Sequence, residues 1–316
     1  MEVQPVDAEG EDNYWPSLPV EIIHIILCCG YSDSSNDPTR KRAFEAHSFI
    51  CRLVCRLWRD VLPPVPKGFA LSFAPAVAVQ GSISLLQWAK EMVSPRAWSG
   101  SLKATALAAV KGGHLELMKW LQDENGWKDS QCTEMAATTG HLEMLMWLRE
   151  KDCSWDSDTC SGAAGAGHLE VLKWARANGC TWDLKTCAMA AKGGHIEVLK
   201  WLRANRCMWD ELTFSYAASG GRIPTLKWLA EHKCPWNEQA CKAAAGEGKL
   251  KPLKWLRKHG CPWDPQTTLY AATGGHLEVL NWAHANGCPM HPNAKWHATM
   301  YLRHEVVAWL NENGFK

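Results

Sequence analysis

The chain carries 14 cysteines and 13 histidines among its 316 residues, so zinc binding is the first chemistry to consider. A zinc site needs four ligands that converge at about 2.0–2.3 Å, usually from Cys-x(2–4)-Cys pairs. Here the pairs are seven residues apart and recur every 27 residues, which places stacked copies about 10 Å from each other, too far to share a metal. We interpret these cysteines as small buried hydrophobic residues and expect no metal site. The pairs are Cys153/Cys160, Cys180/Cys187 and Cys234/Cys241.

Five histidines recur at one position of the same pattern, which argues against a Cys–His nucleophile, because catalysis requires one special residue and not five copies. We predict a structural hydrogen-bonding role for them. Glycine pairs precede a helix, but no strand leads into them and no Gly-Lys-Ser/Thr follows, so no phosphate loop is indicated. The sequence thus predicts no catalytic residue, no cofactor and no enzyme. The histidines are His114, His141, His168, His195 and His276.

Tryptophan shows the pattern most clearly, with 19 copies against 5 tyrosines and 6 phenylalanines. One set recurs every 27 residues, and a second tryptophan column and a cysteine column keep the same interval. Such a period is typical of stacked supersecondary units. Because one unit cannot bury its apolar face alone, we expect neighbouring units to share a continuous core that contains the indoles. The first set is Trp120, Trp147, Trp174, Trp201, Trp228, Trp255, Trp282 and Trp309, and the second is Trp155, Trp182, Trp209, Trp236 and Trp263.

Each unit predicts two short helices. An Asp or Asn such as Asp156 follows the second tryptophan column and suits a helix N-cap. An Ala-Ala pair then favours helix one and is small enough to let a neighbouring helix come close. A glycine such as Gly167 ends helix one, since only glycine takes the left-handed conformation without cost. No interval leaves room for a strand, so the predicted fold class is all-α, a solenoid of helical hairpins.

The run from Ala163 to Trp174, Ala-Ala-x-x-Gly-His-Leu-Glu-Val-Leu-Lys-Trp, resembles the core signature of the ankyrin repeat, with Trp in place of a leucine. The resemblance covers residues 76–316, with degenerate first and last repeats. The period is 27 and not the family's 33, and the missing residues fall where that family has its hairpin finger. The resemblance implies a solenoid that binds partner proteins, and it moves the expected binding surface from the finger tips to helix one.

Residues 18–62 share neither the period nor the motifs of the repeats. Leu18-Pro19-Val20-Glu21-Ile22-Ile23, followed by Val54-Cys55-Arg56-Leu57-Trp58, is similar to the F-box, with a longer middle stretch at Ser32–Arg42. In that family the module docks on the Skp-type adaptor of a cullin–RING ubiquitin ligase. The alternative is a helical cap over the end of the solenoid. The resemblance implies adaptor-binding residues Leu18, Pro19, Ile22, Ile23, Val54 and Trp58.

Candidate partner-binding residues lie in helix one, where two neighbouring positions vary between repeats. Stacking aligns each position into a row along the solenoid, which is the kind of surface that solenoids use for partners. Tyrosine is favoured at interface hot spots, so Tyr216 and Tyr270 are the best anchors, whereas a role in the core is the alternative. The first row is Met135, Gly162, Met189, Tyr216, Ala243 and Tyr270; the second is Glu134, Ser161, Ala188, Ser215, Lys242 and Leu269.

Charge nearly cancels over the whole chain, with 34 basic and 33 acidic side chains, but not over residues 222–259. Two repeats there lose the glutamate of the pattern, and Lys249 and Lys251 are the strongest candidates to receive an acidic partner segment. A solvated helix face is the alternative. Nine basic residues oppose Glu231, Glu238 and Glu247, a balance of +6: Arg222, Lys227, Lys233, Lys242, Lys249, Lys251, Lys254, Arg257 and Lys258.

We therefore expect an acidic disordered tail (1–17), an F-box-like module (18–62), a proline linker (63–75) and the solenoid (76–316). The predicted function is a substrate-receptor subunit of a Skp–cullin–F-box ubiquitin ligase that holds an unknown target protein. The alternatives are a scaffold without ligase linkage and a nucleic-acid binder that uses residues 222–259, which the neutral overall charge disfavours.

No apolar run approaches the roughly 20 residues of a membrane span, and the start is acidic, unlike a signal peptide. We expect reduced thiols and a location in the cytoplasm or nucleus, without membrane contact. The combination of modules resembles the F-box/ankyrin proteins of large DNA viruses of amoebae, which implies a host's cytoplasm. The chain is expected to act as a monomer within a complex.

Overall fold

The computed structural model describes residues 69–92, 95–125 and 129–315. Every element in these ranges is a helix, and they contain no strand, which confirms the all-α prediction. The chain divides into two compact units, residues 1–127 and 128–316. The predicted acidic tail, the F-box-like module and its six adaptor-binding residues lie outside the described ranges: Leu18, Pro19, Ile22, Ile23, Val54 and Trp58.

The described part of the first unit contains two hairpins, α4 (Phe69–Ala78) with α5 (Ile83–Met92) and α6 (Pro95–Lys111) with α7 (Leu115–Asn125). Helix α4 packs along α6. It begins inside the segment that was expected to be a proline linker (63–75), before the expected start of the solenoid at residue 76. The apolar side chains of this segment are the reason, because Ala74, Val77 and Ala78 are buried.

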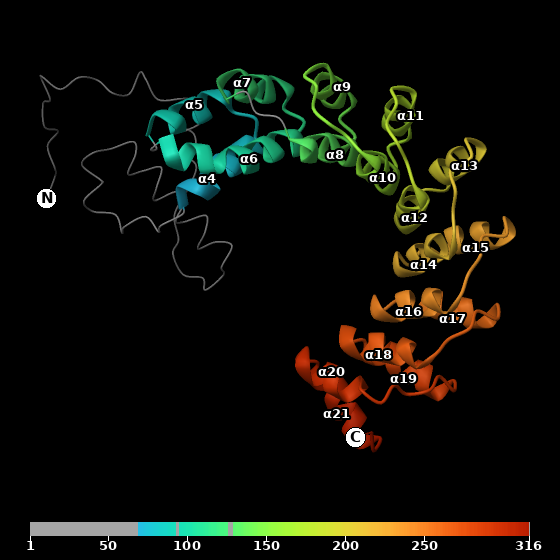
Figure 1. Ribbon diagram of the computed structural model, residues 1–316. Helices are drawn as coiled ribbons and strands as arrows, with labels where there is room; N and C mark the ends of the chain where they lie inside the picture. The colour runs from blue at the N-terminus through green and yellow to red at the C-terminus, as the bar shows by residue number, and fades with distance from the viewer. Residues whose placement is uncertain (1–68, 93–94, 126–128, 316) are drawn as a thin grey trace, which may run out of the picture. The chain divides into compact units, whose positions relative to one another are not determined.

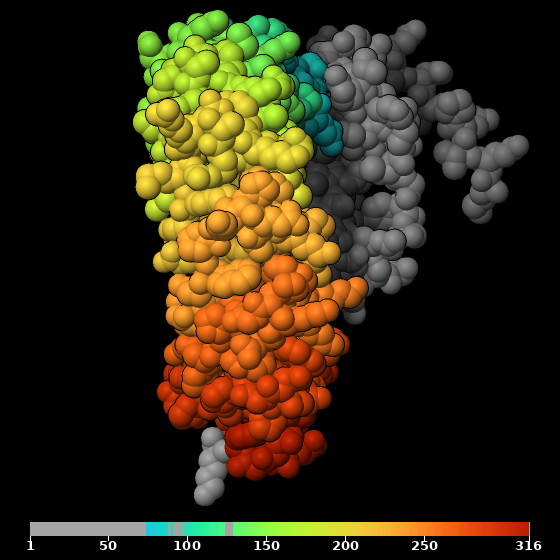
Figure 2. Space-filling view, turned by 90° about the vertical axis from the view of Figure 1, so that its right-hand side faces the viewer, coloured from blue at the N-terminus to red at the C-terminus, as the bar shows by residue number. Residues whose placement is uncertain are grey.

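The described part of the second unit contains seven hairpins in sequence order. In Figure 1 the first helices of the hairpins, which are the even-numbered helices from α8 to α20, form an inner row. The second helices lie outside this row. From green to red, Figure 2 shows the hairpins as successive layers. The hairpins are α8 (Ser130–Thr139) and α9 (Leu142–Glu150), α10 (Ser157–Ala166) and α11 (Leu169–Ala177), α12 (Leu184–Gly193) and α13 (Ile196–Ala204), α14 (Glu211–Ser219) and α15 (Ile223–Glu231), α16 (Glu238–Gly246) and α17 (Leu250–Lys258), α18 (Pro265–Gly274) and α19 (Leu277–Ala285), and α20 (Ala294–Met300) and α21 (His304–Glu312).

The predicted cap residues set the ends of helix one. Asp156 precedes α10 and accepts a hydrogen bond from the backbone N–H of Asp158 at 2.9 Å, which satisfies a donor of the first turn. Gly167 ends α10 with φ of 84°. A Cβ atom there would lie 2.5 Å from Nδ1 of His195, so both the backbone conformation and the space require glycine. Both predictions are confirmed.

The core consists of helix one packed against helix one of the next hairpin and covered by helix two. The Ala-Ala pairs, such as Ala190 and Ala191, are fully buried at this contact and let the helices come close. Helix two adds a leucine face, of which Leu199 and Leu202 are examples. The solenoid prediction is therefore confirmed for the second unit.

The prediction that the indoles lie inside the core is wrong about how deeply they are buried. The described tryptophans of both columns are half-buried and line the outer side of the hairpins. Trp155 meets Trp174 of the next hairpin edge-to-face, with ring centroids 5.8 Å apart, and Trp182 meets Trp201 in the same way at 5.7 Å. An arginine covers the free face of the first ring, as Arg149 does for Trp155 at 4.2 Å.

Leu302 provides a test of the turn geometry. It stands where the other hairpins have glycine, its φ is 55°, and its side chain is 71% exposed. We expect Leu302→Gly to stabilise the α20–α21 hairpin by about 0.5–1 kcal/mol, because it removes the left-handed penalty but makes the unfolded chain more flexible. Urea unfolding checks this. Leu302→Ala keeps the Cβ and should change stability little, and an equal gain from that variant would contradict the explanation.

Candidate functional site

The repeated histidines hold neighbouring hairpins together. Nε2 of His276, at the start of α19, donates to the carbonyl of Gly246 at the end of α16, at 2.9 Å. His114 does the same to Val79 at 2.8 Å, and Arg222 replaces the histidine with an Nε contact to the carbonyl of Lys192 at 3.3 Å. This confirms the structural role. Lys249 occupies the same column, so one predicted partner-binding residue stands at a histidine position.

The repeated cysteines serve the opposite end of helix one. Sγ of Cys180 donates to the carbonyl of Asp156, the N-cap residue of the preceding hairpin, at 3.2 Å. The same contact recurs down the second unit. Cys160 also forms a hydrogen bond with Cys180, and this bond and then burial raise the pKa of the Cys160 thiol. The loop cysteine that follows one hairpin thus interacts with both the N-cap carbonyl and the cysteine of that hairpin's first helix.

These buried thiols have a structural role in packing and not a reactive one. Burial raises the pKa of Cys234 to about 12 and the pKa of Cys288 to about 11, so neither forms the reactive thiolate near neutral pH. Within the described ranges, no group of three histidine, cysteine or acidic residues is arranged to hold a metal ion.

We expect iodoacetamide at about pH 8 to leave Cys234 and Cys288 unmodified in the folded protein and to modify both in urea. The reason is that both side chains are buried, with exposed fractions of 6% and 2%, and that the folded state holds their thiols protonated. Peptide mapping by mass spectrometry measures each residue separately. Labelling of Cys234 in the folded chain at the rate seen in urea would contradict this assignment.

The structure treats the two predicted helix-one rows differently. The first row is accessible: Met135, Met189 and Tyr216 are half-buried, and Tyr270 is 51% exposed. In the second row, next to it on the same helices, four of the six members are buried between hairpins and belong to the core. The buried members are Ser161, Ala188, Ser215 and Leu269.

A groove of about 290 Å³ crosses the inner face of α8, α10 and α12. Two glycines of α10 line it: Gly162 stands where every other hairpin of this row carries a side chain, and Gly165 stands where the two neighbouring hairpins carry Thr138 and Lys192. Glu134 and Asp158 line it and make it acidic, and Lys185 neutralises Asp158 through an ion pair of 2.6 Å. We call it the acidic groove.

Burial, followed by the neighbouring Asp158 carboxylate, raises the pKa of Glu134 above its ordinary value. The folded chain therefore disfavours the ionised form, and this penalty exists only above the pKa of the unfolded state. We expect Glu134→Gln to raise the melting temperature slightly at about pH 7, with a gain that shrinks towards about pH 4. Thermal unfolding across this range measures it, with Glu143→Gln on the outer helix α9 as the control. A gain that grows on acidification would contradict the assignment.

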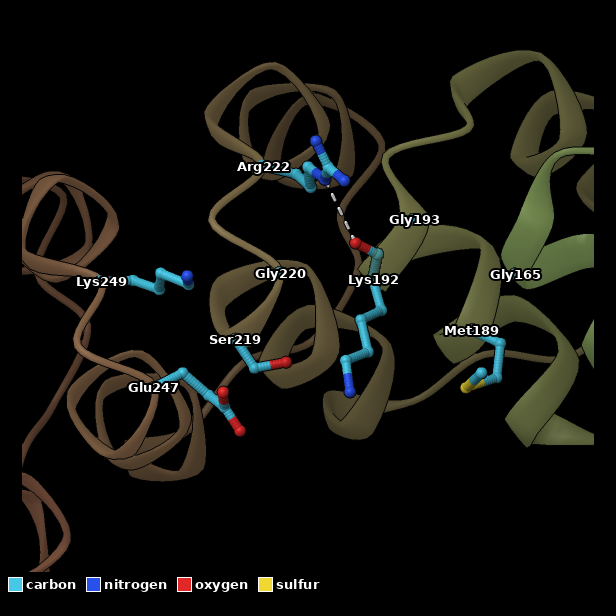
Figure 3. A pocket seen from close by; sticks show the side chains of 9 residues that line it. All are labelled: Gly165, Met189, Lys192, Gly193, Ser219, Gly220, Arg222, Glu247 and Lys249. Atoms are coloured by element: carbon cyan, nitrogen blue, oxygen red, sulfur yellow. Dashed lines mark hydrogen bonds between the residues drawn. The ribbon is translucent and has the colours of Figure 1, made fainter. Parts of the chain in front are cut away.

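A second groove of about 410 Å³ crosses the ends of α12, α14 and α16. Figure 3 shows Arg222 and Lys249 reaching it from the turns that follow α14 and α16, with Lys192 at the end of α12. Glu247 is the single acidic side chain of its lining. This second groove is therefore basic, and we call it the basic groove. Gly165 and Met189 line both grooves and join them.

The basic segment 222–259 does not form one surface. Arg257 stacks over Trp263 at 4.2 Å, and Lys242 forms an ion pair with Asp264 at 3.2 Å, so both are engaged in the fold. Lys249 lines the basic groove, whereas Lys251 lies exposed on the outer helix α17. The two lysines that the sequence grouped together thus serve different faces.

Lys192 and Gly165 line the grooves but were not among the residues predicted from the sequence. They occupy one repeat position at the end of helix one. A signal was present, because this position varies as freely as the predicted rows do. Its members are Thr138, Gly165, Lys192, Ser219, Gly246 and Thr273.

Comparisons with known proteins add little to this description. No family model and no curated protein matches the chain. Among solved structures, the crystal structure of the human ASB11 ankyrin repeat domain is similar over 50% of this chain and 84% of that chain, with 18% identity and a TM-score of 0.38. The hairpin architecture therefore stands on the chain's own contacts. None of the described helices has both the length and the apolar character needed to cross a bilayer.

Proposed function

We propose that the chain is a protein–protein interaction scaffold whose inner helix row holds a target protein. The observation that carries this proposal is the pair of joined grooves across five consecutive hairpins, α8 to α17, on the row of helices that stacking aligns. Solenoids use such extended surfaces for partners. Met189 lies where the grooves meet, and Tyr216 and Tyr270 continue its row along α14 and α18.

We further propose that residues 18–62 connect this scaffold to the Skp-type adaptor of a cullin–RING ubiquitin ligase, which would make the chain a substrate receptor. The support is the F-box-like pair of motifs around Leu18-Pro19 and Trp58. The target would be held by the solenoid and ubiquitin transferred by other subunits. The ten described cysteines are free thiols, which supports a reducing compartment such as the cytoplasm or nucleus.

Two variants separate the functions in one capture experiment from a eukaryotic lysate. We expect Leu18→Asp/Trp58→Ala to lose the adaptor and to keep the other captured proteins, because it alters only the amino-terminal motifs. Tyr216→Ala/Tyr270→Ala should keep the adaptor and lose at least one other protein. Quantitative mass spectrometry measures both, and circular dichroism confirms that each variant retains its helices.

The outcomes distinguish the two proposals. A wild-type chain that captures proteins but never the adaptor leaves the scaffold alone and removes the ligase link. A tyrosine variant that captures every protein as well as the wild type does contradicts the assignment of the inner row.

A further inference from the structure

The acidic and basic grooves form one continuous surface with opposite charges at its ends. Both are lined by Gly165 and Met189, so a chain that leaves one groove enters the other. Between α8 and α16 the surface crosses four helix-to-helix steps, roughly 32–40 Å at 8–10 Å a step. An extended segment of about 12 residues spans this distance.

The acidic end of the surface has more carboxylates than cationic side chains. Lys185 pairs with Asp158 at 2.6 Å, and Glu134 beside them carries a raised pKa because burial and Asp158 disfavour its charge. Two carboxylates, Glu134 and Asp158, thus share one lysine, and a lysine or arginine of a bound segment would balance the second negative charge.

The basic end of the surface has more cationic side chains than carboxylates. Lys192, Arg222 and Lys249 come from three consecutive hairpins and line the groove together with one acidic residue, Glu247. Arg222 uses Nε for the carbonyl of Lys192, as the histidines of other hairpins use their rings. Arg222 and Lys249 stand at a repeat position that is histidine in His168, His195 and His276, and their charge makes this end of the groove basic.

The junction is apolar and narrow. The side chain of Met189 in α12 packs against Gly165 in α10. A Cβ atom added to Gly165 would lie 3.2 Å from the methionine side chain. The thioether is half-buried and adaptable, so it can pack against an aliphatic residue of a partner.

We propose that this joined groove binds an extended segment of a partner protein with a basic residue at one end, an apolar residue near the middle and two or more acidic residues at the other end. The inference rests on the scaffold function and names the class of segment that the scaffold accepts. A nucleic acid fits less well, because the carboxylates of Glu134 and Glu247 line the same surface and repel phosphates.

A display library of random 12-residue peptides tests this with the full-length chain. We expect the enriched peptides to carry lysine or arginine at one end and aspartate or glutamate at the other. The best peptide is then synthesised with a fluorophore, and its affinity is measured by anisotropy at low salt, with a 12-nucleotide single-stranded DNA as the competing probe.

Variants of the chain locate the two ends. Lys192→Glu/Lys249→Glu and, separately, Glu134→Lys should each weaken binding by about tenfold or more, because each reverses the charge that meets one end of the peptide. Lys227→Glu/Lys258→Glu makes the same charge change as the first variant on the exposed outer helices α15 and α17, and should change the affinity less than about twofold. A peptide with its acidic residues replaced by lysine should regain affinity for Lys192→Glu/Lys249→Glu.

Enriched peptides without charge polarity, or an equal loss in the outer-helix variant, would overturn the inference and leave the scaffold function standing. Tighter binding of the DNA probe than of the peptide would overturn it in favour of a nucleic-acid ligand. A library that yields no enriched peptide also counts against the groove, and the capture experiment then decides the scaffold function independently.

Discussion

The structure of the second unit depends on one contact, the close packing of each first helix against the first helix of the next hairpin. Alanine pairs allow the two first helices to come close. Side chains that follow in the sequence donate hydrogen bonds to carbonyls at both ends of each first helix. For α12, Cys207 donates to the carbonyl of Asp183 at the beginning, and Arg222 donates to the carbonyl of Lys192 at the end. The carbonyl of Lys192, in the last turn, has no donor within the helix and receives one from the next hairpin, whereas the carbonyl of Asp183 accepts the thiol in addition to the backbone N–H of Thr186. The two fastenings explain why both columns keep the 27-residue interval.

This requirement also decides where the surface can vary. Positions used for stacking repeat, whereas positions on the inner face of helix one change from hairpin to hairpin without cost to the stack. The grooves arise at such positions, partly through added charge at Lys192 and Lys249 and partly through missing side chains at Gly162 and Gly165. A binding surface can therefore be built on this scaffold without any change in its core.

The predictable parts of the molecule were those determined within one repeat. N-caps such as Asp156 and left-handed glycines such as Gly167 follow from spacing along a single helix or turn. Contacts between repeats were less predictable. The rotation of one hairpin relative to the next decides which of the two adjacent helix-one rows is buried, and spacing within a repeat does not give this rotation. Ser161 and Ala188 are in the core for that reason, although Met189 beside them is accessible. The contact of Cys160 with Cys180 and the division of Lys249 from Lys251 have the same origin. The prolines before Phe69 predicted a linker to residue 75, whereas the apolar residues from Phe69 onward form α4.

The tryptophans show how a repeat of 27 residues remains stable. The loop between hairpins is too short to form an independent element, and it turns its cysteine and its tryptophan back onto the stack. Trp182 contacts Trp201 of the next hairpin, and Arg176 both stacks on Trp182 at 4.3 Å and donates to the carbonyl of Cys180 at 3.0 Å. One arginine thus fixes the loop and covers the ring. A half-buried indole suits this place better than a fully buried one, because its outer face can accept the cation while its edge still meets the neighbouring ring. Since this part of the loop is committed to holding hairpins together, the inner grooves are the surface on which partner recognition can change from repeat to repeat.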